Sequence, residues 1–414
     1  MRPSGSPTST ATRAPRTPSP SATSCAGYGR SSAHATDVRR AVALALVLVP
    51  LLASACATRR WASEPVLRER AYTEEIALLQ RVSVYDDPAL AVYLSGLGQR
   101  LTGARLPFHV LRDPTLNLFA TPTGEVIVHT GLLAAADNEA QLAAALAHEL
   151  AHVVQGDALE SGEPEPLAPR LQGDALGSRT AQAIFALGLP VTARAAITGY
   201  GRERERDADA AGLVSLARAG WDVGEAPAMF RRLTARAREA GPREIFFFGN
   251  RRRLDERIST TRALLGLRFT AVANRFRSSE DFERLLPPVV RENAYEDIRQ
   301  GRFELARQQL ERVSAARPDD ARAQLYQGEL RRLQAQHASA TAERDVELAQ
   351  ARAAYERALA LDPALAEAHR QLGLLYYAMR DVVRARAELE QYLAQAPDAP
   401  DRARIGEYVL ELVR

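Results

Sequence analysis

The chain has 414 residues, of which 46% are hydrophobic and 25% charged, and it contains two cysteines. This composition excludes a disulfide-rich miniprotein and a wholly disordered chain, and the length allows two or three domains with buried cores. The formal net charge is +3, but residues 1–40 hold six arginines against one acid, so the remainder is close to neutral. Without a basic stripe, there is no electrostatic case for nucleic-acid binding.

The N-terminal part has the layout of an export segment. Residues 1–37 are rich in Ser, Thr, Pro, Ala and Arg without periodicity, which predicts a disordered tail, or an untranslated one if translation starts at Val38. Residues 38–56 combine two arginines, the short apolar run Ala41–Ala53 and small residues, as a signal peptide does. Their Ala-Ser-Ala-Cys ending resembles a bacterial lipoprotein signal. This resemblance implies a lipidated Cys56 and a lipoprotein at the periplasmic face of a bacterial membrane, with plain secretion and an uncleaved anchor as alternatives.

Residues 57–288 predict a mainly α domain with a small β-sheet. Apolar positions recur at helical spacing over residues 60–105. Two short β-rich runs, Phe108–Arg112 and Glu125–His129, follow and predict strands. From Asp137 onward the pattern is helical to the end of the domain, with interruptions rich in proline and glycine.

The strongest local motif lies in the first helix after the strands. Asn138 suits an N-cap and Gly156 suits a helix end. His148 and His152 are four residues apart, so both imidazoles leave the same face and can reach one ion, with Glu149 beside them. This HExxH spacing predicts two zinc ligands and a glutamate that takes a proton from water. The alternative is a core helix whose histidines are satisfied by hydrogen bonds.

A catalytic zinc site needs a third protein ligand and leaves a further position open for water. An Arg/Glu-rich helix 53 residues after His152 offers Glu205 and Asp209, which are four apart and share a face with small residues. Glu203 and Asp207 point elsewhere. We interpret Glu205 as the third zinc ligand and Asp209 as the acceptor that orients a ligand histidine. The alternative is a solvated charge run, which is the usual meaning of alternating Arg and Glu.

Residues 289–414 show a repeat of small and aromatic positions. The step from Pro363 to Pro397 is 34 residues, which is the length of a tetratricopeptide unit. An earlier unit ends at Pro318, which implies an insertion of about 11 residues near 331–346. Residues 398–412 suit a capping helix. The fold class is therefore a helical zinc-peptidase domain with a small β-sheet, followed by a tetratricopeptide α-solenoid with a concave surface for proteins. An irregular helical bundle is the alternative for this second domain.

Taken together, these motifs resemble the zinc metalloendopeptidase family of CAAX prenyl protease and the HtpX heat-shock protease. The arrangement with C-terminal repeats is similar to its periplasmic BepA-like branch, which maintains outer-membrane assembly. The resemblance implies that His148, His152 and Glu205 bind zinc, that Glu149 is the base, and that the strand Glu125–His129 pairs with extended substrate. It covers about residues 60–270 and rests on Asn117, Phe119, Gly124, Thr130–Leu133, His148–His152, Glu205, Ala208 and Asp209.

The chain also departs from the family pattern. Leu118 stands where the family usually has alanine, and the His-Pro pair that usually precedes an arginine of a later helix, here Arg257, is missing. Control of the zinc by that histidine is therefore absent or different here. For stabilisation of the oxyanion, His129 and Tyr200 are candidates by location only, and a structural role is the alternative for each.

The sequence therefore predicts a zinc-dependent metalloendopeptidase with one Zn²⁺ per chain. Its expected substrates are unfolded or misassembled envelope proteins, in quality control or outer-membrane assembly. Its repeats are expected to bind protein partners, and Cys56 is expected to supply a membrane anchor. Two alternatives remain: a zinc-stabilised chaperone or assembly scaffold with little proteolysis, and a repeat adaptor with a decayed protease domain. The retained Glu149 and intact ligands argue against both.

Overall fold

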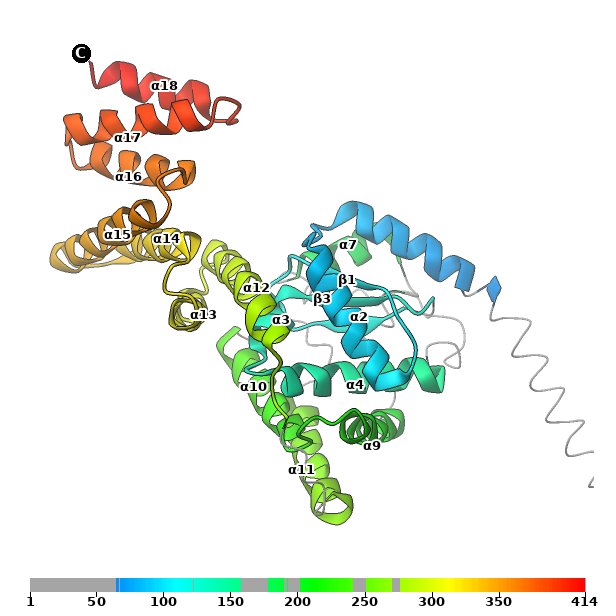
Figure 1. Ribbon diagram of the computed structural model, residues 1–414. Coiled ribbons are helices and arrows are strands. Elements are labelled where there is room, and N and C mark those ends of the chain that lie inside the picture. The colour runs from blue at the N-terminus through cyan, green and yellow to red at the C-terminus, as the bar shows by residue number, and fades with distance from the viewer. Residues whose placement is uncertain are drawn as a thin grey trace, which may run out of the picture. The chain divides into compact units, whose positions relative to one another are not determined.

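The computed structural model describes residues 65–66, 68–121, 123–157, 178–189, 192, 202–240, 251–269 and 276–413 (Figure 1). The predicted tail at 1–37, the signal peptide at 38–56 and Cys56 lie outside these residues. Contacts join Arg60–Arg414 into one unit. In the described ranges, no helix combines the length and apolar character needed to cross a membrane.

The first half is helical around a small sheet, as predicted. The strands are β1 (Phe108–Leu111), β2 (Leu118–Ala120) and β3 (Val126–His129), in the order β1-β3-β2. β3 runs parallel to β1, pairing Phe108 with Val126, and antiparallel to β2, pairing Leu118 with Val128. Residues 68–81 are also helical. The named helices are α2 (Pro88–Thr102), α3 (Thr130–Ala135), α4 (Glu139–Gln155), α7 (Arg179–Leu187), α9 (Arg202–Arg218), α10 (Glu225–Ala240) and α11 (Arg251–Arg268).

The expectation that the strand Glu125–His129 pairs with extended substrate is wrong. β3 is the central strand, so its two edges are taken by β1 and β2. A strand offers backbone donors and acceptors to two neighbours only. β2 has only three residues and was not predicted from the sequence, and it occupies one of the two edges of β3.

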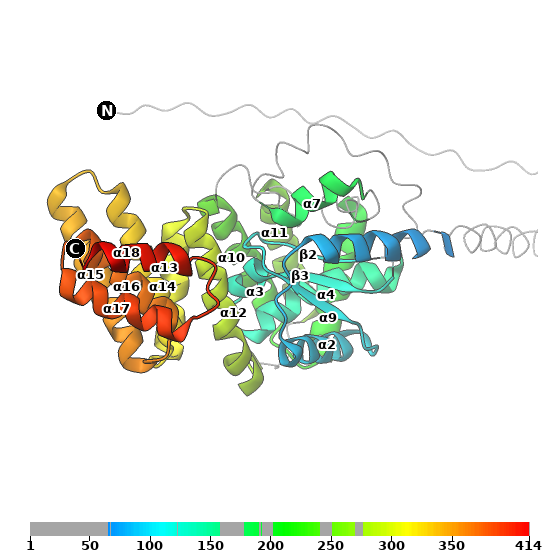
Figure 2. The same ribbon diagram turned by 90° about the horizontal axis from the view of Figure 1, so that it is seen from above.

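The core of this half forms around α4, whose residues Glu139–His152 are all buried. α9 lies against it in both views (Figures 1 and 2). Gly212 makes the close approach possible, because a Cβ at this position would lie 3.2 Å from the backbone of Ala147 and of His148. That is tighter than ordinary carbon contacts of about 3.5–4.0 Å. The two helices that carry the predicted motifs are therefore in direct contact.

The second half consists of antiparallel helix pairs, as predicted for tetratricopeptide repeats. α14 packs on α15 and α16 packs on α17. The extra residues expected near 331–346 lengthen one pair, because α14 has 17 residues and α15 has 21, against 13 and 14 in α16 and α17. The helices are α12 (Glu280–Arg299), α13 (Phe303–Ala316), α14 (Ala321–His337), α15 (Thr341–Leu361), α16 (Ala366–Ala378), α17 (Val382–Gln395) and α18 (Arg402–Glu411).

The predicted domain boundary at residue 288 falls within α12. Phe282, Leu285, Leu286 and Val289 of this helix belong to the first core, whereas its later apolar residues belong to the second. Pro287 and Pro288 lie inside the helix. Pro288 leaves the carbonyl of Arg284 without its usual partner in the helix, and Arg317 of the second half donates to that oxygen at 2.5 Å.

Two polar contacts tie α3 to the repeats. The Thr130 hydroxyl donates to Asn293 Oδ1 at 2.9 Å, and both residues are buried. Arg312 of α13 donates to the carbonyl oxygens of Ala134 and Ala136 at 2.8 and 3.2 Å, at the C-terminal end of α3. α3 is thus held between the first half and the start of the repeats, and it directly follows the central strand β3.

Candidate metal centre

Local sequence signals place the two histidines of α4. The Asn138 side chain accepts from the backbone N–H of Gln141, and Gly156 ends the helix in the left-handed region at φ 71°, as predicted. His148 and His152 therefore lie one turn apart on one face, and each is only 2% exposed. Their rings meet edge to face with centroids 4.9 Å apart.

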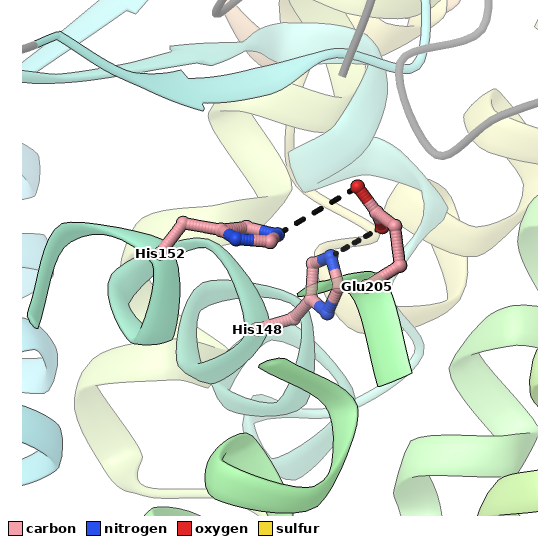
Figure 3. Close-up of side chains that lie close together, drawn as sticks. All are labelled: His148, His152 and Glu205. Atoms are coloured by element: carbon pink, nitrogen blue, oxygen red, sulfur yellow. Dashed lines mark ion pairs between the residues drawn. The ribbon is translucent and has the colours of Figure 1, made fainter. Parts of the chain in front are cut away.

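Glu205 from α9 faces both rings (Figure 3). Its Oε2 lies 3.3 Å from His148 Nε2, and its Oε1 lies 3.8 Å from His152 Nε2. One ligand atom from each of the three residues can be chosen so that all lie within 4.8 Å of one another. Two imidazole nitrogens and one carboxylate oxygen are a donor set that zinc accepts. The structure thus brings together the three residues that the spacing singled out.

The outer nitrogen of each ring faces a carboxylate. His148 Nδ1 lies 2.9 Å from Asp209 Oδ1, and His152 Nδ1 makes a 2.7 Å hydrogen bond with Asp157 Oδ2. Because an ionised carboxylate only accepts, it holds the proton of a neutral imidazole on Nδ1, and the lone pair on Nε2 of that neutral ring then faces Glu205. Asp209 thus lies beside His148, one of the two histidines that it was predicted to orient. Asp157 was missed, and its only sequence signal is that it directly follows Gly156.

Glu149 lies in the same buried space. It is 1% exposed, and its Oε1 lies 3.7 Å from His148 Nε2. Oε1 has no hydrogen-bond partner within the described ranges. A carboxylate oxygen that is buried and has a free hydrogen-bonding position is placed to take a proton from a reactant.

Residues 100–260 match the model of peptidase family M48. The chain contains an M48 peptidase domain. Residues 337–409 match a tetratricopeptide repeat model. Every residue of the centre described above lies inside the M48 domain.

Curated relatives agree with this assignment over part of their length. The chain is 32% identical over 171 residues to the beta-barrel assembly-enhancing protease of Escherichia coli K12, covering 37% of this chain and 34% of that protein. It is 31% identical over 136 residues to the mitochondrial metalloendopeptidase OMA1 of Schizosaccharomyces pombe, covering 32% of this chain and 39% of that protein. The matches span about a third of the length of the first of these relatives.

Among solved structures, the chain is similar to a thermophilic tetratricopeptide protein of Thermus thermophilus. The sequence identity is 18%, the TM-score is 0.27, and the likeness covers 46% of this chain and 81% of that one.

Arg257 of α11 completes the M48 centre on the side of His148. Its guanidinium donates to both oxygens of Asp209, with contacts of 2.6 to 3.2 Å, and the residue is only 5% exposed. The guanidinium also lies over the ring of Phe230, in a cation–π contact. No role was predicted for this arginine, because it lies in an arginine-rich run whose sequence is typical of a solvated helix face.

The buried charges of the M48 centre are strongly coupled. Burial raises the pKa of Asp209, but Arg257 and His148 together outweigh burial and lower that pKa to about 2. Burial also raises the pKa of Glu205, but His148, Arg257 and His152 together outweigh burial and lower that pKa to about 2. Burial raises the pKa of Glu149 well above its usual range. Glu205 and Asp209 therefore carry negative charge in a buried space, a condition that favours a divalent cation.

The two ligand histidines shift in opposite directions. Burial and Arg257 lower the pKa of His148, but Asp209 and Glu205 outweigh them and raise it to about 9. Burial and the neighbouring His148 lower the pKa of His152 to about 4. Burial and the neighbouring charged groups of the centre therefore determine the pKa values of both rings.

A second group of possible ligands, Glu75, His109 and Glu125, lies at the sheet. Hydrogen bonds among protein groups account for it, since His109 Nε2 pairs with Glu125 at 2.9 Å and Thr123 donates to Glu75 at 2.9 Å. His109 and Glu125 are also partly exposed. We assign no metal there.

The structure favours the structural alternative for His129. The ring is 0% exposed, and its Nδ1 pairs with the Thr115 hydroxyl at 2.9 Å, while Thr115 donates to Asp113 at 2.7 Å. A group that stabilises an oxyanion has to reach the substrate. Tyr200, the other candidate, lies outside the described residues.

Proposed function

We propose that this chain is a zinc-dependent metalloendopeptidase that hydrolyses peptide bonds of envelope proteins, in protein quality control or outer-membrane assembly. The observation that carries the proposal is the buried convergence of His148, His152 and Glu205 beside Glu149 in an M48 domain. The names of the relatives, a beta-barrel assembly-enhancing protease and a metalloendopeptidase, support the reaction class and the envelope setting.

The residues fit one zinc ion. His148 and His152 would bind through Nε2 and Glu205 through its carboxylate, which leaves a coordination position for the reaction. Zinc bound there would supply Lewis acidity toward the scissile carbonyl and toward water. Glu149 then accepts the proton of the attacking water and passes it to the leaving amine. Asp209 holds the His148 ring in the tautomer that presents Nε2.

Metal removal tests the proposal directly. The mature chain from Ala57 onward should cleave unfolded casein, lose this activity in EDTA and regain it when zinc is added back. Glu205→Ala should lose both zinc and cleavage. The control is Glu203→Ala, because Glu203 is exposed on the same helix and should leave both unchanged. Full cleavage by the EDTA-treated chain or by Glu205→Ala would contradict the assignment.

The repeats are proposed to bind protein partners. α13, α14 and α15 line a hollow of about 380 Å³, and its walls are polar and aliphatic. A surface of this kind suits an extended polypeptide better than a small apolar ligand. The hollow is lined by Arg307, Leu310, Glu311, Gln324, Gln327, Leu330, Arg331, Gln350, Ala353 and Ala354.

The proposed location is the periplasmic face of a bacterial membrane, through a lipid on Cys56. The signal-like segment at 38–56 supports it. Cys56→Ser should move the chain from the membrane fraction to the soluble fraction in fractionated cells, and it should abolish incorporation of labelled fatty acid. A variant that keeps both membrane association and the label would contradict the anchor.

A further inference from the structure

Two charged residues, Asp157 and Arg204, lie beside His152 and have no role in the mechanism given above. Asp157 is 4% exposed; its Oδ2 pairs with His152 Nδ1 at 2.7 Å, and its Oδ1 accepts from Arg204 at 3.0 Å. Arg204 also donates to the backbone carbonyl of Asp157 at 3.2 Å. We propose that Asp157 and Arg204 are a positioning pair that fixes the tautomer and orientation of His152 for metal binding. This inference rests on the proposed function, since it treats His152 as a zinc ligand.

The turn at the end of α4 brings Asp157 to this position. Continued helix would place residue 157 about 140° around the axis from His152, on a different face. Instead Gly156 adopts φ 71°, and its N–H bonds to the carbonyl oxygens of His152 and Val153. This reversal returns Asp157 toward the ring, and glycine adopts such a conformation at little steric cost.

Each oxygen of the Asp157 carboxylate has a different hydrogen-bond partner. Asp157 uses one oxygen for the ring and the other for the guanidinium, so the carboxylate is held at two points. A carboxylate held in this way cannot swing away from Nδ1 without breaking its contact with Arg204. The Nε2 lone pair of His152 is then aimed at the space that it shares with Glu205, at 3.8 Å.

The same arrangement is present on the other histidine. There Arg257 holds Asp209, which faces His148 Nδ1 at 2.9 Å. The two arginines come from different helices: Arg257 from α11 and Arg204 from α9. Because Arg204 directly precedes Glu205, α9 contributes both a ligand and the brace for a ligand on α4. Displacement of the start of α9 would therefore remove Glu205 and loosen His152 together.

The competing explanation is an ion pair that only stabilises the end of α4. The Arg204 side chain is 35% exposed, and partly exposed ion pairs contribute about 0–1 kcal/mol to the free energy of unfolding. The two explanations differ in what a substitution changes. A stabilising pair changes the free energy of unfolding of the metal-free chain, whereas a positioning pair changes the affinity for the ion.

The experiment measures zinc affinity of the mature chain by competition with a chromophoric chelator, for wild type, Asp157→Ala, Arg204→Gln and Arg204→Lys. We expect Asp157→Ala to weaken zinc binding about 10–100-fold, the range for partners of ligand histidines. Arg204→Gln should act in the same direction by less, and Arg204→Lys should recover part of the loss by keeping the charge. The matched control is Arg206→Gln, because Arg206 is exposed on the same helix and pairs with Glu256.

Two further readouts separate the outcomes. The visible spectrum of the Co²⁺-loaded chain should change in Asp157→Ala, because it reports ligand geometry. Urea unfolding in EDTA should be nearly the same for all variants. Unchanged zinc affinity in Asp157→Ala, or a loss matched by equal destabilisation of the EDTA-treated chain, would overturn the positioning role while leaving the peptidase intact. A wild-type chain that binds no zinc would instead refute the proposed function, and this inference with it.

Discussion

Glu149→Gln should lower the turnover of unfolded casein about 10²–10⁴-fold, the usual contribution of a positioned acid–base group. Glutamine has nearly the same shape but cannot accept the proton of the attacking water. Zinc content should stay at one per chain, because Glu149 is not among the three residues that converge as ligands. The measurements are steady-state cleavage and metal analysis on the same preparations.

A matched substitution separates loss of the base from loss of a charge. Glu203→Gln removes one carboxylate from an exposed position of α9 and should leave turnover unchanged. Undiminished cleavage by Glu149→Gln with normal zinc would refute the role of base. If neither wild type nor variant cleaves although both hold zinc, the chaperone or scaffold alternative gains support.

Removal of residues 289–414 should unfold the M48 domain rather than free it. The cut would end α12 directly after Pro288, remove Val289 from the first core and delete Asn293, the partner of Thr130. It would also uncover α3, which packs along α12. Each buried aliphatic side chain that is lost costs about 1.5–3 kcal/mol, and an unpaired buried polar group costs a further ~1–3 kcal/mol. These losses approach the total stability of a typical domain, about 5–15 kcal/mol.

The control is a chain that ends at residue 320, after α12 and α13. It keeps Asn293 and Arg312, and therefore both polar contacts with α3. Circular dichroism and urea unfolding should show a cooperative fold for this chain and none for the chain ending at 288. Equal stability of the two would show that the boundary at 288 is a true domain boundary.

The main features of the centre could be predicted from sequence because helical spacing is local. His148, His152 and Glu149 lie on one helix, so a period of 3.6 residues determines their common face. Glu205 and Asp209 follow the same rule on α9. Asp157 could not be found in this way, because its position depends on a left-handed turn rather than on helical periodicity. The role of Arg257 could not be predicted for a different reason. The sequence around an arginine does not show whether its side chain is buried or solvated.

The sequence alone determined the classes of structure: the helices, the caps of the helix that carries the histidines, two of the strands, the zinc-ligand spacing and the 34-residue repeat. These follow from interactions between residues that are near in the chain. Only the tertiary structure decided which strand lies in the middle of the sheet, which arginines meet Asp209 and Asp157, and that α12 serves both cores. Those features depend on packing between segments far apart in the chain, where burial and charge pairing, rather than local propensity, set the free energy.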